Sequence, residues 1–320
     1  MKKKILLTIL LITLPLSLLF SNNLTNLISV ELQKMYNSNF ELSIGSNTCN
    51  IGTFTWEDSG VGTTFSSYLQ KSVQEAVVET KSFDLILSDI QPIFGPEASA
   101  ILAQNTEMKL GAFLIFGNYS LEGASINLNL KIFSNSFSKV MSETNIKLPM
   151  EIVPMGMQVI PADLDKINNV SREIDNLYGK SELDIFVTTS RGNGAVFVED
   201  EFMQVYILAS ENCYIKMFLI GVDGHAVQIF PNKFEPNNFL PGKQMLRFPG
   251  KTSPFKFQLV PPLGTETIKV IASTVQFSDI NNGFKDLGMA TRGIFVMETE
   301  SEEQETMAET SFFYTIVPKN

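Results

Sequence analysis

The chain begins with an apolar run that follows a cluster of lysines. Met1–Lys4 is basic, and the next sixteen residues, 5–20, carry no charge. This layout is typical of a secretory signal peptide, and a helix of that length spans only about 24 Å, less than the core of a bilayer. We therefore expect cleavage after Ser21, with residues 1–21 as the signal peptide and residues 22–40 as an N-terminal lead segment.

Residues 41–160 have the pattern of an α/β domain. Apolar residues recur at helical spacing after the N-cap Thr63, and Pro96 fits the first turn of a second helix. The alternation of apolar and polar residues after Ala112 is typical of antiparallel strands with one buried face. This order predicts an α/β sandwich, in which helices cover one side of a mixed sheet. The expected strands are residues 49–56, 83–88, 112–119, 124–133 and 137–148, and the expected helices are residues 64–79 and 96–105.

The second half of the chain changes to a β pattern. Residues 161–182 are expected to form a helix, Asp163–Tyr178, and a short hinge. After the hinge, short β-branched and aromatic runs alternate with turns such as Asp223-Gly224. Residues 183–320 therefore predict an all-β, immunoglobulin-like sandwich, and the whole chain has an α+β fold class.

An acidic stretch precedes the end of the chain. Residues 298–309 include six Glu and no basic residue. Such a run is usually solvated and mobile, and its spacing does not match a calcium-binding loop. We expect an acidic loop here, followed by a closing strand at residues 311–317.

Composition and charge exclude several classes of function. The chain has 34 Asp and Glu against 24 Lys and Arg, a net charge of −10. A chain this acidic has no electrostatic attraction for nucleic acid or for an anionic membrane surface. One His and two Cys nearly exclude multi-ligand zinc sites and His-dependent catalytic triads. We expect no metal, no cofactor, no catalytic residue and no nucleic-acid partner.

The positions of the two cysteines indicate where in the cell the protein resides and whether it is lipid-anchored. A bacterial lipoprotein needs a cysteine directly after the apolar run, and the first one here is Cys49. We therefore expect a soluble protein of the periplasm or cell envelope that is not lipid-anchored and has no stable transmembrane insertion after signal cleavage. Cys49 and Cys213 fall in different expected domains, so one bridge between domains and two separately buried thiols are both open.

Few residues are candidates for chemistry. His225 follows the Asp223-Gly224 turn, so it is expected to lie exposed at a hairpin, and no catalytic motif accompanies it. Glu57 and Asp58, beside the lone Trp56, are the most site-like acids. A solvated strand end explains these two acids better than a carboxylate pair for glycan cleavage.

The N-terminal half carries motifs of a known periplasmic domain. The run FSSYLQKSVQEAVVETKSFDLI, followed by GNYSLEGASINLNLKIF, resembles the α/β domain shared by three families. These are the curli-secretion channels, the flagellar outer-membrane assembly lipoproteins and the lipoprotein activators of penicillin-binding proteins. The resemblance implies the soluble domain alone, because the chain lacks the long alternating strands of a membrane pore.

The C-terminal half carries a more specific series of motifs. The runs NCYIKMFLIGVDGHAVQIFPN, NNFLPGKQMLRFP and FKFQLVPPLGTETIKVIAS are very similar to the uncharacterised bacterial domain-of-unknown-function family 4384. This resemblance covers nearly all of residues 183–277, implies a β-sandwich and brings no established catalytic residues. We interpret its signature residues as fold determinants, with a ligand groove as the alternative. They are Cys213, Tyr214, Phe230, Pro231, Asn232, Gly242, Pro262, Gly264 and Glu266.

Together these features predict a non-enzymatic exported envelope protein that binds other envelope components. It would be an assembly or accessory factor for a secretion, motility or wall-synthesis complex, docking through sheet edges and loops. Envelope proteins are the expected partners, and peptidoglycan is a further candidate. Two alternatives stay open: an exported glycan hydrolase with a carboxylate pair near Trp56, and a small-ligand-binding module in the sandwich.

Overall fold

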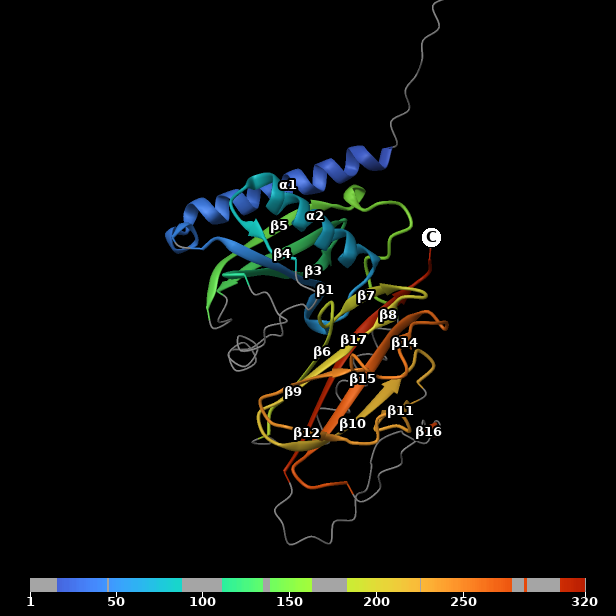
Figure 1. The fold of residues 1–320 in the computed structure, drawn as a ribbon. Helices are drawn as coiled ribbons and strands as arrows, with labels where there is room; N and C mark the ends of the chain where they lie inside the picture. Colours follow the sequence, from blue (N-terminus) through green and yellow to red (C-terminus); the bar gives the residue numbers. More distant parts are fainter. Residues whose placement is uncertain are drawn as a thin grey trace, which may run out of the picture.

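The protein folds into two domains, each around its own hydrophobic core (Figure 1). The α+β fold class is confirmed, since a helix-covered mixed sheet is followed by a β-rich domain. The expected helices at residues 96–105 and 163–178, and His225, lie outside the described residues. The structure, a computed structural model, describes residues 16–44, 46–87, 111–134, 139–162, 183–224, 226–277, 285–286 and 306–319.

The first domain is built on a five-stranded mixed sheet with the order β2-β1-β3-β4-β5. β2 and β3 run parallel to β1, whereas β3, β4 and β5 form the antiparallel meander that the alternating pattern predicts. Along β4, every second residue from Ile126 to Ile132 is buried. The strands are β1 (Thr48–Trp56), β2 (Asp84–Leu85), β3 (Phe113–Glu122), β4 (Ser125–Ser134) and β5 (Val140–Pro149), and the 3₁₀ turn η3 (Met150–Ile152) follows.

The expected helix after Thr63 is confirmed as α2 (Thr64–Thr80). Thr63 Oγ1 accepts the Ser66 N–H at 3.3 Å, and the Thr63 N–H donates to Ser66 Oγ at 2.8 Å, which completes a capping box. The Tyr119 hydroxyl of β3 lies 2.7 Å from Thr63 Oγ1 and donates to the Val159 carbonyl at 3.1 Å. The start of the helix is thereby fixed to the sheet. Its buried apolar residues are Phe65, Leu69, Val73, Ala76 and Val77.

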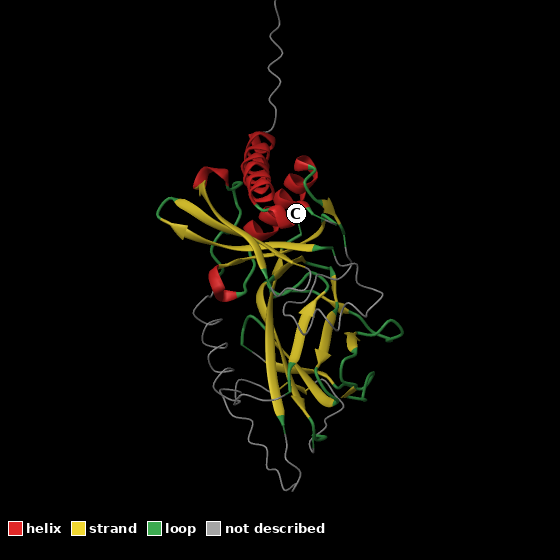
Figure 2. Ribbon diagram, turned by 90° about the vertical axis from the view of Figure 1, so that its left-hand side faces the viewer, coloured by secondary structure: helices red, strands yellow, loops and turns green. Residues whose placement is uncertain are grey.

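A second helix, α1 (Leu16–Ser38), covers the same face of the sheet as α2 (Figure 1, Figure 2). Thr25 of α1 donates to the Glu75 carboxylate of α2 at 3.1 Å. Residues 22–40, which the pattern marks only as a lead segment, are thus mostly helical and packed into the domain, and the 3₁₀ turn η1 (Phe40–Ser43) follows them. The stripe that enters the core is Leu24, Ile28, Leu32 and Met35, at spacings of three and four residues.

The second domain is a β-sandwich. Its larger sheet has the order β16-β11-β10-β15-β17-β7, with β12 beside β10, and its smaller sheet has the order β13-β9-β6. Side chains of both sheets meet in one core, among them Ile207 of β9 and Val270 of β15. The strands are β6 (Ile185–Thr189), β7 (Ala195–Val198), β8 (Phe202–Met203), β9 (Val205–Ala209), β10 (Cys213–Ile220), β11 (Ala226–Phe230), β12 (Phe239–Leu240), β13 (Met245–Phe248), β14 (Phe257–Gln258), β15 (Gly264–Ser273), β16 (Lys285–Asp286) and β17 (Met307–Val317).

The last strand, β17, lies inside the larger sheet, between β15 and β7. It begins at Met307, within the stretch that is expected to be a solvated acidic loop. The Glu309 side chain is 3% exposed and forms an ion pair with Lys269 of β15. For residues 307–309 the expectation of a solvated loop is wrong, because the neighbouring strand supplies a buried cation. Residues 298–305 lie outside the described part of the chain.

The two cysteines are free thiols in separate cores, Cys49 in the first domain and Cys213 in the second. The alternative of two separately buried thiols therefore holds. Burial raises the pKa of Cys49 to about 12, with a smaller contribution from Asp84, and burial raises the pKa of Cys213 to about 11. Both thiols stay protonated at neutral pH and serve as small apolar packing groups.

Candidate functional site

The two domains meet through two glycine-containing turns. One turn follows η2 (Glu57–Ser59) in the first domain, and the other precedes β7 in the second. A Cβ atom on Gly62 would lie 2.0 Å from the Gly194 carbonyl oxygen, and one on Gly194 would lie 2.3 Å from the Gly60 carbonyl oxygen. The two backbones are therefore in direct contact, and this domain junction requires residues without a Cβ atom.

Side chains from both domains reinforce the junction. Thr53 of β1 donates to the Asn193 carbonyl at 2.9 Å, and Thr315 of β17 donates to the Gly62 carbonyl at 2.9 Å. Val61 of the first domain packs against Phe313 of the second. Because each domain both donates to and accepts from the other, the orientation between them is well defined.

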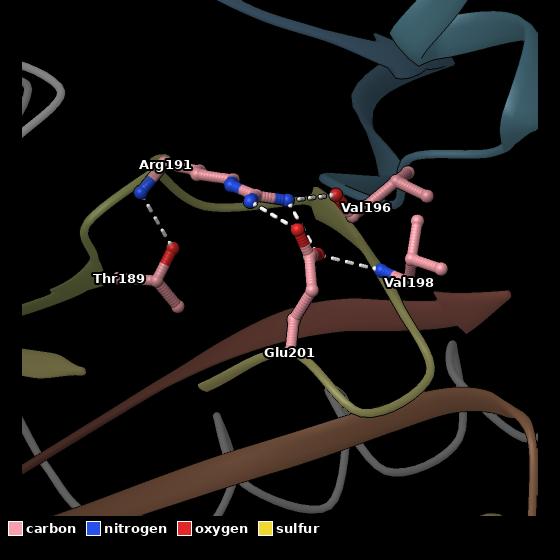
Figure 3. A network of polar contacts seen from close by, with 5 residues as sticks. All are labelled: Thr189, Arg191, Val196, Val198 and Glu201. Carbon is pink, nitrogen blue, oxygen red and sulfur yellow. Dashed lines mark hydrogen bonds and ion pairs between the residues drawn. The ribbon is translucent and has the colours of Figure 1, made fainter. Parts of the chain in front are cut away.

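A network of polar contacts lies beside the junction, on the two turns that flank β7 (Figure 3). Arg191 Nη1 and Nη2 donate to Glu201 Oε2 and Oε1 at 2.8 and 2.7 Å, a bidentate ion pair. Arg191 Nη1 also donates to the Val196 carbonyl at 3.2 Å, and Glu201 Oε2 accepts the Val198 N–H at 2.7 Å. The guanidinium carbon of Arg191 lies 4.6 Å from the ring centroid of Phe197. The turns before and after β7 are thus tied together.

The charge state of this pair follows from its surroundings. Partial burial raises the pKa of Glu201, but the hydrogen bonds from Arg191 and from the Val198 N–H outweigh this effect, so the pKa lies below its ordinary value. Glu201 is therefore ionised at neutral pH. The two side chains are 46% and 34% exposed, so solvent weakens their attraction and the pair contributes mainly to geometry.

The turn held by this ion pair leads into the β8–β14 ribbon, which presents apolar side chains to solvent. Phe202 is 56% exposed and Val260, just after β14, is 52% exposed. Charged residues lie nearby: Lys256 Nζ lies 5.2 Å from the Phe202 ring centroid, and Asp200, whose N–H donates to the Leu259 carbonyl next to Val260, pairs with Lys319 at 3.4 Å. An apolar centre with a charged rim is the usual anatomy of a protein interface.

These residues are not among the candidates from the sequence. Arg191 belongs to an Arg-Gly-Asn-Gly segment that predicts only a turn, and its pairing with Glu201 depends on the strand between them. Phe202 stands directly after Glu199, Asp200 and Glu201. A large aromatic residue in such a polar run is a signal that could have identified an exposed apolar site.

A second polar pair is buried inside the sandwich, on β15 and β17. The Tyr314 hydroxyl donates to the Glu266 carboxylate, and the two residues are 1% and 8% exposed. Burial raises the pKa of Glu266, the hydrogen bond from Tyr314 lowers it and Asp223 raises it, with a net shift upward. Burial also raises the pKa of Tyr314. The folded chain therefore holds a proton on Glu266 more readily than the unfolded chain does.

Glu266 is expected to make stability depend on pH. Because its folded pKa lies above its ordinary value of 4.5, its stabilising contribution is complete below that pH and is lost as the pH rises through the folded pKa. Glu266→Gln should remove this dependence. At neutral pH the variant should therefore be more stable than the wild type, by about 1.4 kcal/mol for each tenfold difference in proton affinity between folded and unfolded Glu266. Urea unfolding at about pH 4 and pH 7.5 measures the effect, with exposed Glu211→Gln as control. An equal difference at both pH values would contradict the expectation.

Among the other signature residues, Asn232 organises a loop. Its side-chain oxygen accepts the N–H groups of Phe234 and Glu235 at 2.8 and 3.0 Å, and its Nδ2 donates to the Ile229 carbonyl at 2.8 Å. Asn232 is fully buried, and its three partners are Ile229 near the end of β11 and Phe234 and Glu235 in the loop that follows, all within three residues of it. The rest are spread through the sandwich: Cys213 and Phe230 in the core, Tyr214 partly buried, Pro231 and Pro262 after cis peptide bonds, and Gly242 and Gly264 at close approaches to other segments.

The structure separates Trp56 from the acids that follow it. Trp56 is 7% exposed and lies in the first core, with its ring centroid 5.7 Å from that of Tyr119. Glu57 is exposed in η2, with a φ of 44°, and Asp58 belongs to the same turn. The aromatic ring thus faces the core, whereas Glu57 faces solvent beside the domain junction.

Among the described residues, no group of three or more His, Cys, Asp or Glu side chains could hold a metal ion. No helix in the described ranges is long and apolar enough to cross a membrane.

A family model, that of a domain of unknown function named DUF4384, matches residues 196–276. This match confirms the resemblance of the C-terminal half, and it includes Glu201 and Phe202. No curated protein matches the sequence.

Three solved structures share a fold likeness with part of the chain. The LpoB C-terminal domain from Salmonella enterica is 10% identical, with a TM-score of 0.29, and the match covers 41% of this chain and 98% of that one. The same domain from Escherichia coli is 10% identical with a TM-score of 0.26, covering 36% and 93%, and the NMR structure of E. coli LpoB is 8% identical with a TM-score of 0.25, covering 39% and 66%. These matches are consistent with the resemblance noted for the N-terminal half.

Proposed function

We propose that this protein is a non-enzymatic, exported accessory protein of the bacterial envelope that binds other envelope components through the β8–β14 ribbon. The observation that carries the proposal is the exposure of Phe202 and Val260, at 56% and 52%, on a ribbon whose leading turn is fixed by a bidentate ion pair. The basic and apolar N-terminal segment supports export.

The geometry suits binding for an energetic reason. A partner that binds a flexible loop must offset the entropy lost when that loop becomes ordered, whereas a fixed loop does not impose this cost. Arg191 and Glu201 hold the turn before Phe202, and the domain junction lies directly beside it. Aromatic side chains at the centre of an interface commonly provide much of the binding energy.

A photo-crosslinking amino acid at Phe202 tests this proposal in intact cells. We expect crosslinks from this position to envelope proteins, identified by affinity recovery and mass spectrometry that scores both proteins and glycan fragments. Phe202→Ser should reduce capture of the same partners by about tenfold or more, with little change in stability, because the side chain is exposed.

Phe239 is the matched control. It is also phenylalanine, it is 40% exposed, and it lies on β12 at the end of the sandwich away from the first domain (Figure 1). Crosslinks that are as frequent from Phe239 as from Phe202 would mean that the ribbon is not the docking site. Recovery of glycan alone would favour the hydrolase or ligand-binding alternatives over a protein accessory role.

A further inference from the structure

We infer that β5 of the first domain pairs, antiparallel and centred on Asn145, with β5 of a second copy of this chain. The resulting dimer would join two five-stranded sheets into one sheet across a two-fold axis. The contact involves the first domain only, so it is independent of the proposed role of the β8–β14 ribbon.

The outer edge of β5 is long and open. β5 has ten residues and ends the sheet, and no other strand among the described residues pairs with its outer side. Among the described residues, contacts cover this edge only at its beginning, where Asn39 donates to the Met141 carbonyl and Glu41 pairs with Lys139 at 2.6 Å. From Ser142 onward, no described residue outside β4 hydrogen-bonds to the backbone of β5, so the outward-facing groups can pair with another strand.

The charges of β5 complement a second copy of the same strand. Glu143, Asn145 and Lys147 are exposed and alternate along one face of the strand. In an antiparallel pair centred on Asn145, Glu143 of each copy lies opposite Lys147 of the other, with Cβ atoms about 5 Å apart. Symmetry produces this ion pair twice. Charges of one sign would repel a second copy, whereas this arrangement attracts it.

Neighbouring residues extend the complementarity. Glu143 lies 3.7 Å from Lys131 of β4, and Lys147 lies 3.3 Å from Glu122 of β3. The pairing would place these two existing pairs side by side in a row of alternating sign across the joined sheet. The Glu143 and Lys147 side chains remain 45% and 64% exposed, so both can reach a further partner.

Helix α1 adds apolar surface above the same edge. Thr25 and Ser29 bind Glu75 and Glu79 of α2, so these two residues mark the flank of α1 that faces α2. On a helical projection, Leu27 lies on the other flank, on the side of the β5 edge. Leu27 is 37% exposed, and the two-fold axis brings the two α1 helices toward each other.

Charge reversal tests the pairing. We expect sedimentation of the purified exported chain over a concentration series to show a monomer–dimer equilibrium. Lys147→Glu should weaken the dimer by about tenfold or more, because it places carboxylates opposite Glu143 at both ends of the contact. The double variant Glu143→Lys, Lys147→Glu should dimerise more tightly than Lys147→Glu alone, since it makes both pairs between the copies complementary again. It should not exceed the wild type, because it places like charges beside Lys131 and Glu122 within each copy. Circular dichroism of each variant confirms that it is folded.

A cysteine at the two-fold axis tests the register. Asn145→Cys should form a disulfide-linked dimer under mild oxidation, whereas Glu143→Cys should not, because it would face Lys147. Cys49 and Cys213 are 0% exposed and do not compete. A chain that stays monomeric at all concentrations, a dimer that Lys147→Glu leaves unchanged, or capture of a different protein by Asn145→Cys would each overturn the inference.

Discussion

Replacing Gly194 with alanine is expected to open the domain junction and to destabilise the folded chain by about 2–4 kcal/mol. Two effects combine. Gly194 has a φ of +74°, where an L side chain is strained, and the added Cβ atom would lie 2.3 Å from the Gly60 carbonyl oxygen and 2.7 Å from Thr55 Cγ2. The Gly60 oxygen and the Cα atom that would carry the new Cβ both belong to the backbone, so no side-chain rotation can relieve this clash. It can be relieved only if one domain moves away from the other.

Gly123→Ala separates these two effects. Gly123 also has a positive φ, +61°, but no atom lies within 4 Å of its added Cβ. We expect Gly123→Ala to show only the conformational cost, about 1–2 kcal/mol. The additional destabilisation in Gly194→Ala then measures the cost of the clash at the domain junction. Urea unfolding gives the free energies, and limited proteolysis should cut the Gly194→Ala chain between domains faster than the wild type. Equal costs for the two variants would show that the junction tolerates the extra atom.

Ile28→Ala is expected to destabilise the first domain by about 3 kcal/mol, although residue 28 lies in a region whose sequence suggests only a lead segment. Ile28 is fully buried at the centre of the stripe that α1 directs into the core. Removal of its outer carbon atoms leaves a cavity that the surrounding helices and sheet can fill only partly. Chemical unfolding of the exported chain measures the loss.

Val30→Ala is the matched control, two positions along the same helix. Val30 is 54% exposed, so its truncation should change the unfolding free energy by no more than about 0.5 kcal/mol. Alanine has a higher helix propensity than either isoleucine or valine, so a greater loss of stability in Ile28→Ala than in Val30→Ala comes from packing. If Ile28→Ala cost no more than Val30→Ala, α1 would not be part of the folded core.

The domain junction fixes the position of the β8–β14 ribbon relative to β5. A symmetric dimer through β5 would therefore present two ribbons at a defined separation. Two linked sites bind a repetitive or oligomeric partner more tightly than either site alone. Lys147→Glu should then weaken binding to such a partner without altering the ribbon itself.

Local patterns predicted the elements whose stability depends on near neighbours in the sequence. The helical spacing after Thr63 and the capping hydroxyl predicted α2, and the alternation from Ile126 to Ile132 predicted the buried face of β4. The Asp223-Gly224 turn predicted the hairpin of β10 and β11. The spacing of Leu24, Ile28, Leu32 and Met35 is also helical, but these residues directly follow a signal-peptide pattern, so the local sequence does not show that they pack into the domain.

The sequence alone determined the α+β class and most of the described elements, because periodicity and turn chemistry act over a few residues. Only the tertiary structure decided what depends on distant segments. Glu309 is buried because β17 lies beside Lys269 of β15, and Gly62 and Gly194 are sterically required because two domains bring their backbones together. Likewise, Glu143 and Lys147 become a self-complementary edge only because β5 ends its sheet. Such contacts have no periodic signature along the chain.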